Sequence, residues 1–188
     1  MSSKGVRAAG TDGSDFEHRE TVASRYKTSL KFKSYLRVVT WLSLLLWSLM
    51  GLKLLNHLAE QYEILIPDIA EWAIPEPLGW EYVYLLSFIP SVFGLLSLSH
   101  NRLPYLNILF YGIPLVSVTP VVAAAGYMAQ DFISFGTTHK SKDIFLGYPL
   151  VWLWFVFFAL ALQLHLLQLF FALQLRRAWH KTVSTRSQ

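Results

Sequence analysis

The chain contains no cysteine and few charged residues. Without cysteine there is no disulfide framework, no thiol chemistry and no site for palmitoylation. Charged side chains make up 15% of the residues, whereas 54% are hydrophobic. A typical soluble domain carries about 25% charged residues. The composition therefore argues against a soluble domain and favours a membrane protein.

The motifs of common enzyme classes are also missing from the sequence. There is no Gly-x-Ser-x-Gly elbow, no phosphate-binding loop and no His-x-x-x-His pair. The histidines are scattered, without a helix-spaced carboxylate to complete a metal site. They are His18, His57, His100, His139, His165 and His180. We therefore expect no enzyme activity, no metal and no cofactor. The basic residues lie at the flanks of apolar segments, so nucleic-acid binding is not expected either.

Four long uncharged stretches dominate what is present. The stretch from Leu36 to Leu55 has twenty residues, with Arg37 and Lys53 near its ends. As a helix it would measure about 30 Å, the thickness of a bilayer's hydrocarbon core. The predicted fold is all-α, with a cytosolic N-terminal tail (1–35), a four-helix transmembrane domain (36–175) and a cytosolic C-terminal tail (176–188). Its predicted spans are about 36–55, 82–99, 103–125 and 148–170.

The distribution of charge predicts the orientation of these spans. Eight of the 16 Lys and Arg residues lie at or before Arg37, and four lie at or after Arg176. The segment from Asn56 to Glu81 has no Lys or Arg but carries six carboxylates. By the positive-inside rule both termini are cytosolic and this acidic loop is lumenal or external. The first span is too long for a cleavable signal and follows a charged preface, so we expect it to remain in the mature chain.

Polar side chains inside the predicted spans are concentrated in the fourth span, and none of the spans contains a carboxylate. Gln163, His165 and Gln168 are the candidates for intramembrane polar contacts. His165 and Gln168 share a helix face, whereas Gln163 points elsewhere. With the fourth span entering from the lumen, they are expected in its cytosolic half. They serve either helix packing or a proton relay or substrate contact. Prolines inside the spans indicate either ordinary kinks or a gate; they are Pro90, Pro114 and Pro120.

The N-terminal tail carries a second candidate site. Ser14 and Glu17 have the spacing of a capping box, which predicts a helix starting near Asp15. Apolar residues then recur at roughly helical spacing among basic ones. This pattern is typical of a juxtamembrane helix that lies along the cytosolic leaflet and binds anionic headgroups. The predicted headgroup contacts are Arg25, Lys27, Lys31 and Lys33. Alternatively, the basic run only determines topology.

Several segments resemble one known family. The run from Arg7 to Glu20, Arg-Ala-Ala-Gly-Thr-Asp-Gly-Ser-Asp-Phe-Glu-His-Arg-Glu, is similar to the N-terminal signature of the Jagunal proteins. The segment Trp80–Ser87, the following turn region Gly94–Ser97 and the end of the fourth span resemble theirs as well. The fourth-span match includes Gln163-Leu-His165 and Ala178-Trp179.

The resemblance implies a four-span protein of the endoplasmic-reticulum membrane with cytosolic termini. It also implies a role in reticulum organisation and in vesicle-mediated transport and protein secretion in the early secretory pathway, without catalytic residues. Possible partners are the bilayer with its anionic headgroups and secretory-pathway or coat proteins. The sequence from Lys181 to Gln188 lacks the terminal dilysine that some relatives use for retrieval. The alternative is a small four-span channel, transporter or lipid carrier.

Overall fold

The computed structural model of the chain describes residues 14–62, 74–139, 143–145 and 147–184. Helices account for almost all of the described elements, and two short antiparallel strands pair just before the last helix. The elements in chain order are α1 (Ser14–Gln61), α3 (Gly79–Leu85), α4 (Phe88–His100), α5 (Leu103–Ile113), the π-helix η1 (Pro114–Val118), α6 (Thr119–Tyr127), α7 (Ala129–Thr138), β1 (Ile144–Phe145), β2 (Tyr148–Pro149) and α8 (Leu150–Ser184).

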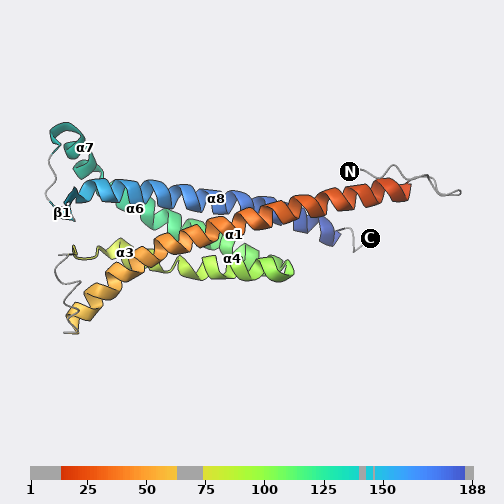
Figure 1. Cartoon of the computed structure of the whole chain (residues 1–188), viewed down its shortest axis with the longest axis horizontal. Helices are drawn as coiled ribbons and strands as arrows, with labels where there is room; N and C mark the ends of the chain where they lie inside the picture. Colours follow the sequence, from red (N-terminus) through yellow and green to blue (C-terminus); the bar gives the residue numbers. More distant parts are fainter. Residues whose placement is uncertain (1–13, 63–73, 140–142, 146, 185–188) are drawn as a thin grey trace.

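Four helical segments are long and apolar enough to cross a membrane, which confirms the predicted all-α class and the number of spans. They are Tyr26–Gln61, Gly79–His100, Leu103–Tyr127 and Leu150–Trp179. The start of α1 and the end of α8 lie at the same end of the bundle, and α3, α7 and β1 lie at the opposite end (Figure 1). This arrangement agrees with an even number of spans.

Helix α1 runs without interruption for 48 residues, which corresponds to about 72 Å. That length is more than twice the thickness of the hydrocarbon core. The helix begins at Ser14, close to the predicted start at Asp15. The side chains of Ser14 and Glu17, on which the capping box depends, lie outside the described residues. Because α1 does not bend before its span, the segment before Leu36 continues along the span axis. The helix predicted to lie along the leaflet is thus continuous with the first span, and its position relative to the leaflet stays a prediction.

The prolines of the middle spans coincide with changes in helix geometry. Pro90 has no N–H to donate to the carbonyl of Leu86, and the second span is interrupted between α3 and α4 at Leu86 and Ser87. Pro114 opens η1, where the Thr119 hydroxyl donates to the Pro114 carbonyl at 2.8 Å. The Pro114 carbonyl therefore accepts from both the backbone N–H and the hydroxyl of Thr119, which closes the wider π-type turn.

Helices α4 and α5 form a close antiparallel hairpin. A Cβ added at Gly94 would come within 2.8 Å of Leu109, and one at Gly112 would come within 2.8 Å of Pro90. Small residues thus let the two helices approach closely, as they do in many membrane interfaces. The segment Gly94–Ser97, expected in a turn, lies inside α4 instead. The turn follows His100, where Asn101 adopts the left-handed conformation with φ 54°.

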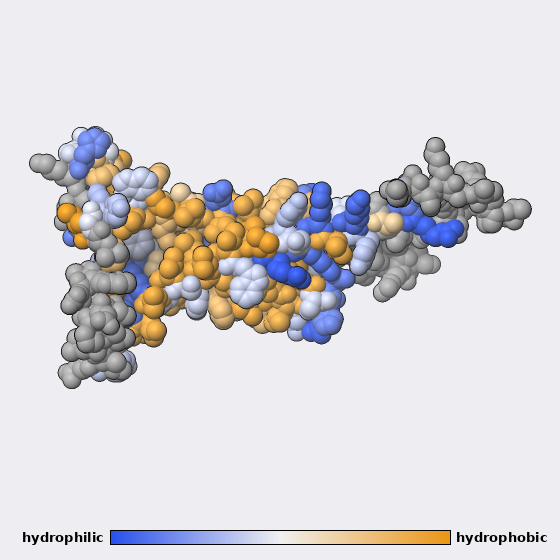
Figure 2. Space-filling view, viewed as in Figure 1, coloured by the Kyte–Doolittle hydropathy of each residue, from blue (hydrophilic) through white to orange (hydrophobic). Residues whose placement is uncertain are grey.

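The buried apolar residues form two clusters along the bundle. One includes Met50, Tyr84, Trp154 and Phe158 and lies toward the α3 end. The other includes Leu36, Leu106 and Leu175 among its members and lies toward the end where α1 begins. Outside the clusters, apolar side chains cover the middle of the visible face, and hydrophilic ones gather toward the start of α1 (Figure 2). This is the surface that a bilayer-embedded bundle presents.

Candidate functional site

A chain of hydrogen bonds joins three helices between the two apolar clusters. The Tyr84 hydroxyl lies 3.3 Å from His165 Nε2, and His165 Nδ1 lies 2.8 Å from Gln168 Oε1. Gln168 Nε2 donates to the Thr40 hydroxyl oxygen at 3.3 Å. Since Gln168 Oε1 can only accept, His165 Nδ1 carries a proton, and a neutral His165 then accepts from Tyr84 at Nε2. The bonds therefore run in one direction from α3 through α8 to α1.

The structure brings together two of the three predicted intramembrane residues. His165 and Gln168 are buried side by side, and Gln163 is exposed on another face of α8. His165 is the sixteenth of the 30 residues from Leu150 to Trp179. It thus lies just past the middle of that segment, and Gln168 lies three residues farther toward its end. That half is cytosolic in the predicted orientation. The sequence alone did not indicate the partners Tyr84 and Thr40, because both belong to other helices.

Both ends of this chain are closed. The side chains of Thr40, Tyr84 and Gln168 are fully buried, and that of His165 is 1% exposed. A proton relay needs a terminal group that exchanges protons with water or with a substrate. None of the four groups reaches such a position. The geometry therefore favours fixed helix packing over proton transfer.

A buried ion pair lies toward the α3 end of the bundle. Lys53 Nζ donates to Glu81 Oε1 at 2.8 Å, and the backbone N–H of Leu78 donates to the same oxygen at 3.0 Å. The Lys53 ammonium also lies 4.8 Å from the centroid of the Trp154 ring. Glu81 is fully buried, and its Oε2 has no hydrogen-bond partner among the described residues. The pair thus ties α1, α3 and α8 together through one charged contact.

Glu81, expected in the acidic loop, lies instead inside the helix that begins at Gly79. The expectation that the spans contain no carboxylate is therefore wrong, because the second span-length segment, Gly79–His100, includes Glu81. One signal could have indicated the pair: Lys53 follows an apolar run in the first span, and a charge in such a place normally has a partner. The choice of Glu81 among six carboxylates required the three-dimensional structure.

The predicted headgroup contacts have different environments at the end where α1 begins. Lys27 and Lys31 are exposed. Lys33 is half-buried, with its Nζ 5.8 Å from the centroid of the Trp179 ring. The Trp179 indole N–H donates to the Ser29 hydroxyl at 3.1 Å, so this part of α1 is held against α8. The side chain of Arg25 lies outside those that the structure describes.

Tyr26 and Leu30 form an exposed apolar stripe on the same part of α1. Their side chains are 69% and 53% exposed, and they are four residues apart, which puts them on one helix face. Lys27 and Lys31 flank this stripe with the same spacing. Within the described residues, no group of three or more metal-binding side chains occurs. The arrangement therefore offers surfaces for binding.

The hydrogen-bonded chain generates a prediction for His165. If the hydrogen-bonded chain serves helix packing, His165→Leu or Gln168→Leu should change the free energy of unfolding by about 1 kcal/mol or less. Interhelical polar contacts in membranes average below that value. Thermal unfolding of the purified protein would measure the change, and Gln163→Leu, on the exposed face, is the matched control. Loss of cargo export by His165→Leu, at normal protein abundance and location, would contradict the packing role.

The ion pair generates a second prediction. Glu81→Gln leaves the Lys53 ammonium without a counter-charge and should lower the free energy of unfolding by about 3–5 kcal/mol. The double variant Lys53→Met and Glu81→Gln should lose clearly less than the sum of the two single variants, as measured by a thermodynamic cycle. Glu60→Gln removes an exposed carboxylate from α1 and should have little effect. Additive single losses would show that the two charges do not interact.

Comparison with known proteins connects this architecture to one family. The family model described as "Jagunal, ER re-organisation during oogenesis" matches residues 1–183. "Protein jagunal" of Drosophila melanogaster is 34% identical over 189 residues, which cover 97% of this chain and 96% of that protein. "Protein jagunal homolog" of Caenorhabditis elegans is 34% identical over 186 residues, covering 95% and 97% of the two chains.

"Protein jagunal homolog 1" of Homo sapiens is 35% identical over 179 residues, which cover 93% of this chain and 92% of the human protein. The match therefore extends over at least 93% of this chain in each of the three comparisons. This agrees with the resemblance seen at Arg7–Glu20 and in the second and fourth spans. The chain belongs to the Jagunal family.

Proposed function

We propose that this protein is a non-enzymatic, multi-pass protein of the endoplasmic-reticulum membrane that supports reticulum organisation. In this proposal it also supports vesicle-mediated transport and protein secretion in the early secretory pathway. The family description, which names re-organisation of the reticulum, supports the first part. The absence of a metal-binding group among the described residues is compatible with a role through surfaces.

The observation that carries the proposal is the extension of α1 beyond the predicted first span. The 22 residues from Ser14 to Tyr35 precede the predicted span and correspond to about 33 Å of helix. Lys33 and Lys31 lie about 5 and 8 Å beyond Leu36 along the axis. The headgroup layer is about 5–8 Å thick on each side of the hydrocarbon core. Lys31 and Lys33 therefore reach the headgroups, whereas Lys27 and Arg25 stand farther out.

This geometry gives the basic run two kinds of partner. Anionic headgroups of the same membrane attract Lys31 and Lys33. The exposed Tyr26 and Leu30, flanked by Lys27 and Lys31, form a stripe that suits an acidic, amphipathic segment of a secretory-pathway or coat protein. Both contacts would take place in the cytosol under the predicted orientation.

The alternative is a small channel, transporter or lipid carrier. A channel or transporter requires polar groups along a path that water or a solute can follow. The hydrogen-bonded chain from Tyr84 to Thr40 ends on buried groups on both sides. That feature supports the organiser over a channel or transporter.

The proposal requires both tails to face the cytosol. Tags at Ser2 and Gln188 should be digested by protease added to sealed microsomes. The start of α1 and the end of α8 carry the excess of Lys and Arg, which the positive-inside rule assigns to the cytosol. A tag inserted within Pro67–Pro77 should be protected until detergent opens the vesicles. Immunoblotting of the tags is the measurement. Protection of either terminus would contradict the orientation.

The basic run generates a functional prediction. Lys27→Glu with Lys31→Glu should weaken attraction to an anionic membrane surface by at least about 1 kcal/mol, since Lys31 lies at the headgroups and each basic residue there contributes about 1 kcal/mol. The pair also removes both cations that flank the Tyr26–Leu30 stripe. The full-length variant, expressed in cells that lack the protein, should insert normally but fail to restore reticulum shape and cargo export. Lys33 is left unchanged because it packs on Trp179.

The matched control replaces the same two residues with arginine, which keeps the charge on the same helix face. This variant should restore both readouts, and a glutamine pair should give an intermediate result. If the glutamate pair supports normal reticulum shape and export at equal abundance, the basic run is a topology determinant only. The working surface would then have to lie elsewhere on the cytosolic side.

A further inference from the structure

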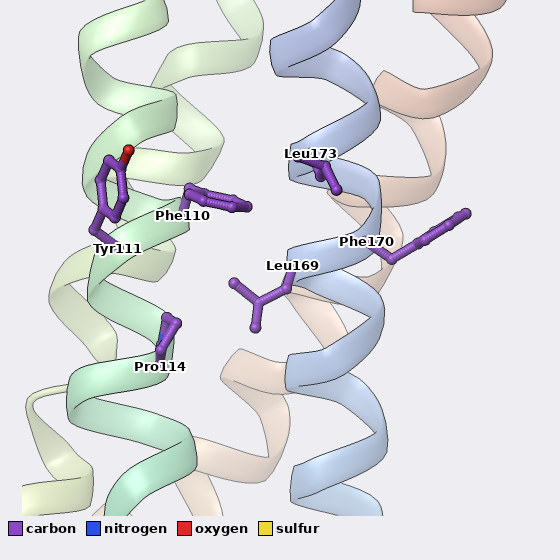
Figure 3. Close-up of a pocket in the computed structure, with 6 residues that line it drawn as sticks. All are labelled: Phe110, Tyr111, Pro114, Leu169, Phe170 and Leu173. Atoms are coloured by element: carbon purple, nitrogen blue, oxygen red, sulfur yellow. The ribbon is translucent and has the colours of Figure 1, made fainter.

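A groove of about 400 Å³ lies between α8 on one side and α5 with η1 on the other. Phe110 and Leu169 point from the two helices into the gap between them (Figure 3). Apart from the Tyr111 hydroxyl, the lining side chains are apolar. The lining consists of Phe110, Tyr111, Pro114, Leu169, Phe170 and Leu173. The volume is in the range of about 300–1,000 Å³ that is usual for ligand pockets.

Arg176 lies at one end of this groove. Its guanidinium carbon is 5.2 Å from the centroid of the Phe110 ring and 5.4 Å from that of the Tyr111 ring. Leu169, Leu173 and Arg176 follow at spacings of four and three residues, so they share one face of α8. Arg176 therefore continues the row of side chains that lines the groove.

The ring contacts of Arg176 use its charge and not its hydrogen-bond donors. The five N–H donors of a guanidinium form hydrogen bonds in its plane. Within the part of the chain that the structure describes, no carboxylate pairs with Arg176. Aromatic rings attract a cation but do not neutralise its charge. The site thus combines an uncompensated positive charge with donors that suit the two oxygens of a phosphate.

The depth of Arg176 matches that of a lipid phosphate. Trp179 binds Ser29 and Gln168 binds Thr40, so Arg176, three residues before Trp179, lies level with Phe32, three residues after Ser29. That level is about 6 Å outside Leu36, in the headgroup layer next to the predicted boundary of the first span. From Arg176 the groove leads past Leu173 to Leu169, about 10 Å deeper along α8. A phosphate at the boundary with an acyl chain below it has the same arrangement.

We propose that the α5–α8 groove binds one anionic glycerophospholipid, with an acyl chain against Phe110, Leu169 and Leu173 and the phosphate on Arg176. The lipid comes from the leaflet at the end where α1 begins, which is the cytosolic leaflet in the orientation proposed above. The site is separate from Lys27 and Lys31 and requires only that the bundle is inserted in a membrane.

A second cavity shows why the charge of Arg176 matters. It has a volume of about 480 Å³, lies between α1 and α8 near the opposite end, and includes Lys53 and Trp154 in its lining. The cation there is already paired with Glu81 at 2.8 Å. That cavity therefore lacks the free positive charge that selects a phosphate, and it is not included in the proposal.

The test uses the full-length protein in nanodiscs of phosphatidylcholine with a minor fraction of phosphatidic acid. Native mass spectrometry after release into mild detergent counts the lipids that stay bound. The unmodified protein should retain one phosphatidic acid in preference to phosphatidylcholine. Arg176→Gln should reduce this occupancy at least about tenfold, equivalent to about 1.4 kcal/mol. Arg176→Lys, which keeps the charge but loses the planar fork, should fall between the two.

Arg177→Gln is the matched control, because Arg177 is the next residue, is exposed and carries the same charge. It should leave the retained lipid unchanged. Leu169→Trp fills the groove and should displace the lipid while Arg176 remains. If that variant fails to fold, as judged by gel filtration, the comparison of Arg176→Gln with Arg177→Gln still decides.

Three results would overturn the proposal. Equal losses in Arg176→Gln and Arg177→Gln would indicate general surface charge. Equal retention of phosphatidylcholine and phosphatidic acid, or no retention by the unmodified protein, would remove the selective site. Displacement of the lipid by millimolar inorganic phosphate would indicate that the groove contributes nothing and that Arg176 binds a phosphate alone.

Discussion

The register between α1 and α8 depends on polar groups that have no water to bind. In the hydrocarbon core an unpaired hydroxyl, amide or imidazole is costly, so Thr40, Gln168, His165 and Tyr84 have to find one another. A shift of α1 by one residue would rotate Thr40 by about 100° away from Gln168. Apolar side chains on both sides tolerate such shifts more easily, because lipid tails and leucine are similar solvents for them. The buried polar chain therefore selects one packing of the two long helices, and the apolar clusters complete it.

Contacts at both ends of α1 and α8 reinforce this register. At one end Trp179 binds Ser29, and at the other Trp154 lies over Lys53. Ser29 and Lys53 are 24 residues apart, and Trp154 and Trp179 are 25 apart, which correspond to about 36 and 38 Å of helix. The near-equal lengths show that the two antiparallel helices match over their whole contact. Each tryptophan combines a large apolar surface with a polar contact, which suits the boundary between hydrocarbon and water.

The number of spans and the shared face of His165 and Gln168 could be predicted because both depend on order along the chain. Uncharged runs near twenty residues indicate spans, and a three-residue spacing in a helix indicates a common face. The partners could not be predicted in this way, since Glu81 is 28 residues from Lys53 and Thr40 is 128 residues from Gln168. The continuous course of α1 was also missed. An amphipathic pattern looks the same in a helix that lies on a membrane and in one that leaves it. The packing of Ser29 and Lys33 against Trp179, which keeps this part of α1 beside α8, joins residues about 150 positions apart and could not be predicted from local spacing.

The cations at the two ends of the bundle have different environments, and both proposed binding surfaces lie at the end where α1 begins. The charge of Lys53 is cancelled by the buried carboxylate of Glu81, so this pair contributes no net charge at the α3 end. Lys33 and Arg176 lie over aromatic rings, which hold their side chains in place but leave their charge intact. Lys27 and Lys31 are exposed on the same part of α1. Ordered cations attract a phosphate with less loss of side-chain entropy than mobile ones do. In the two proposals above, this end therefore offers an exposed basic surface on α1 for headgroups or a protein partner, and a guanidinium held beside aromatic rings on α8 for a single lipid.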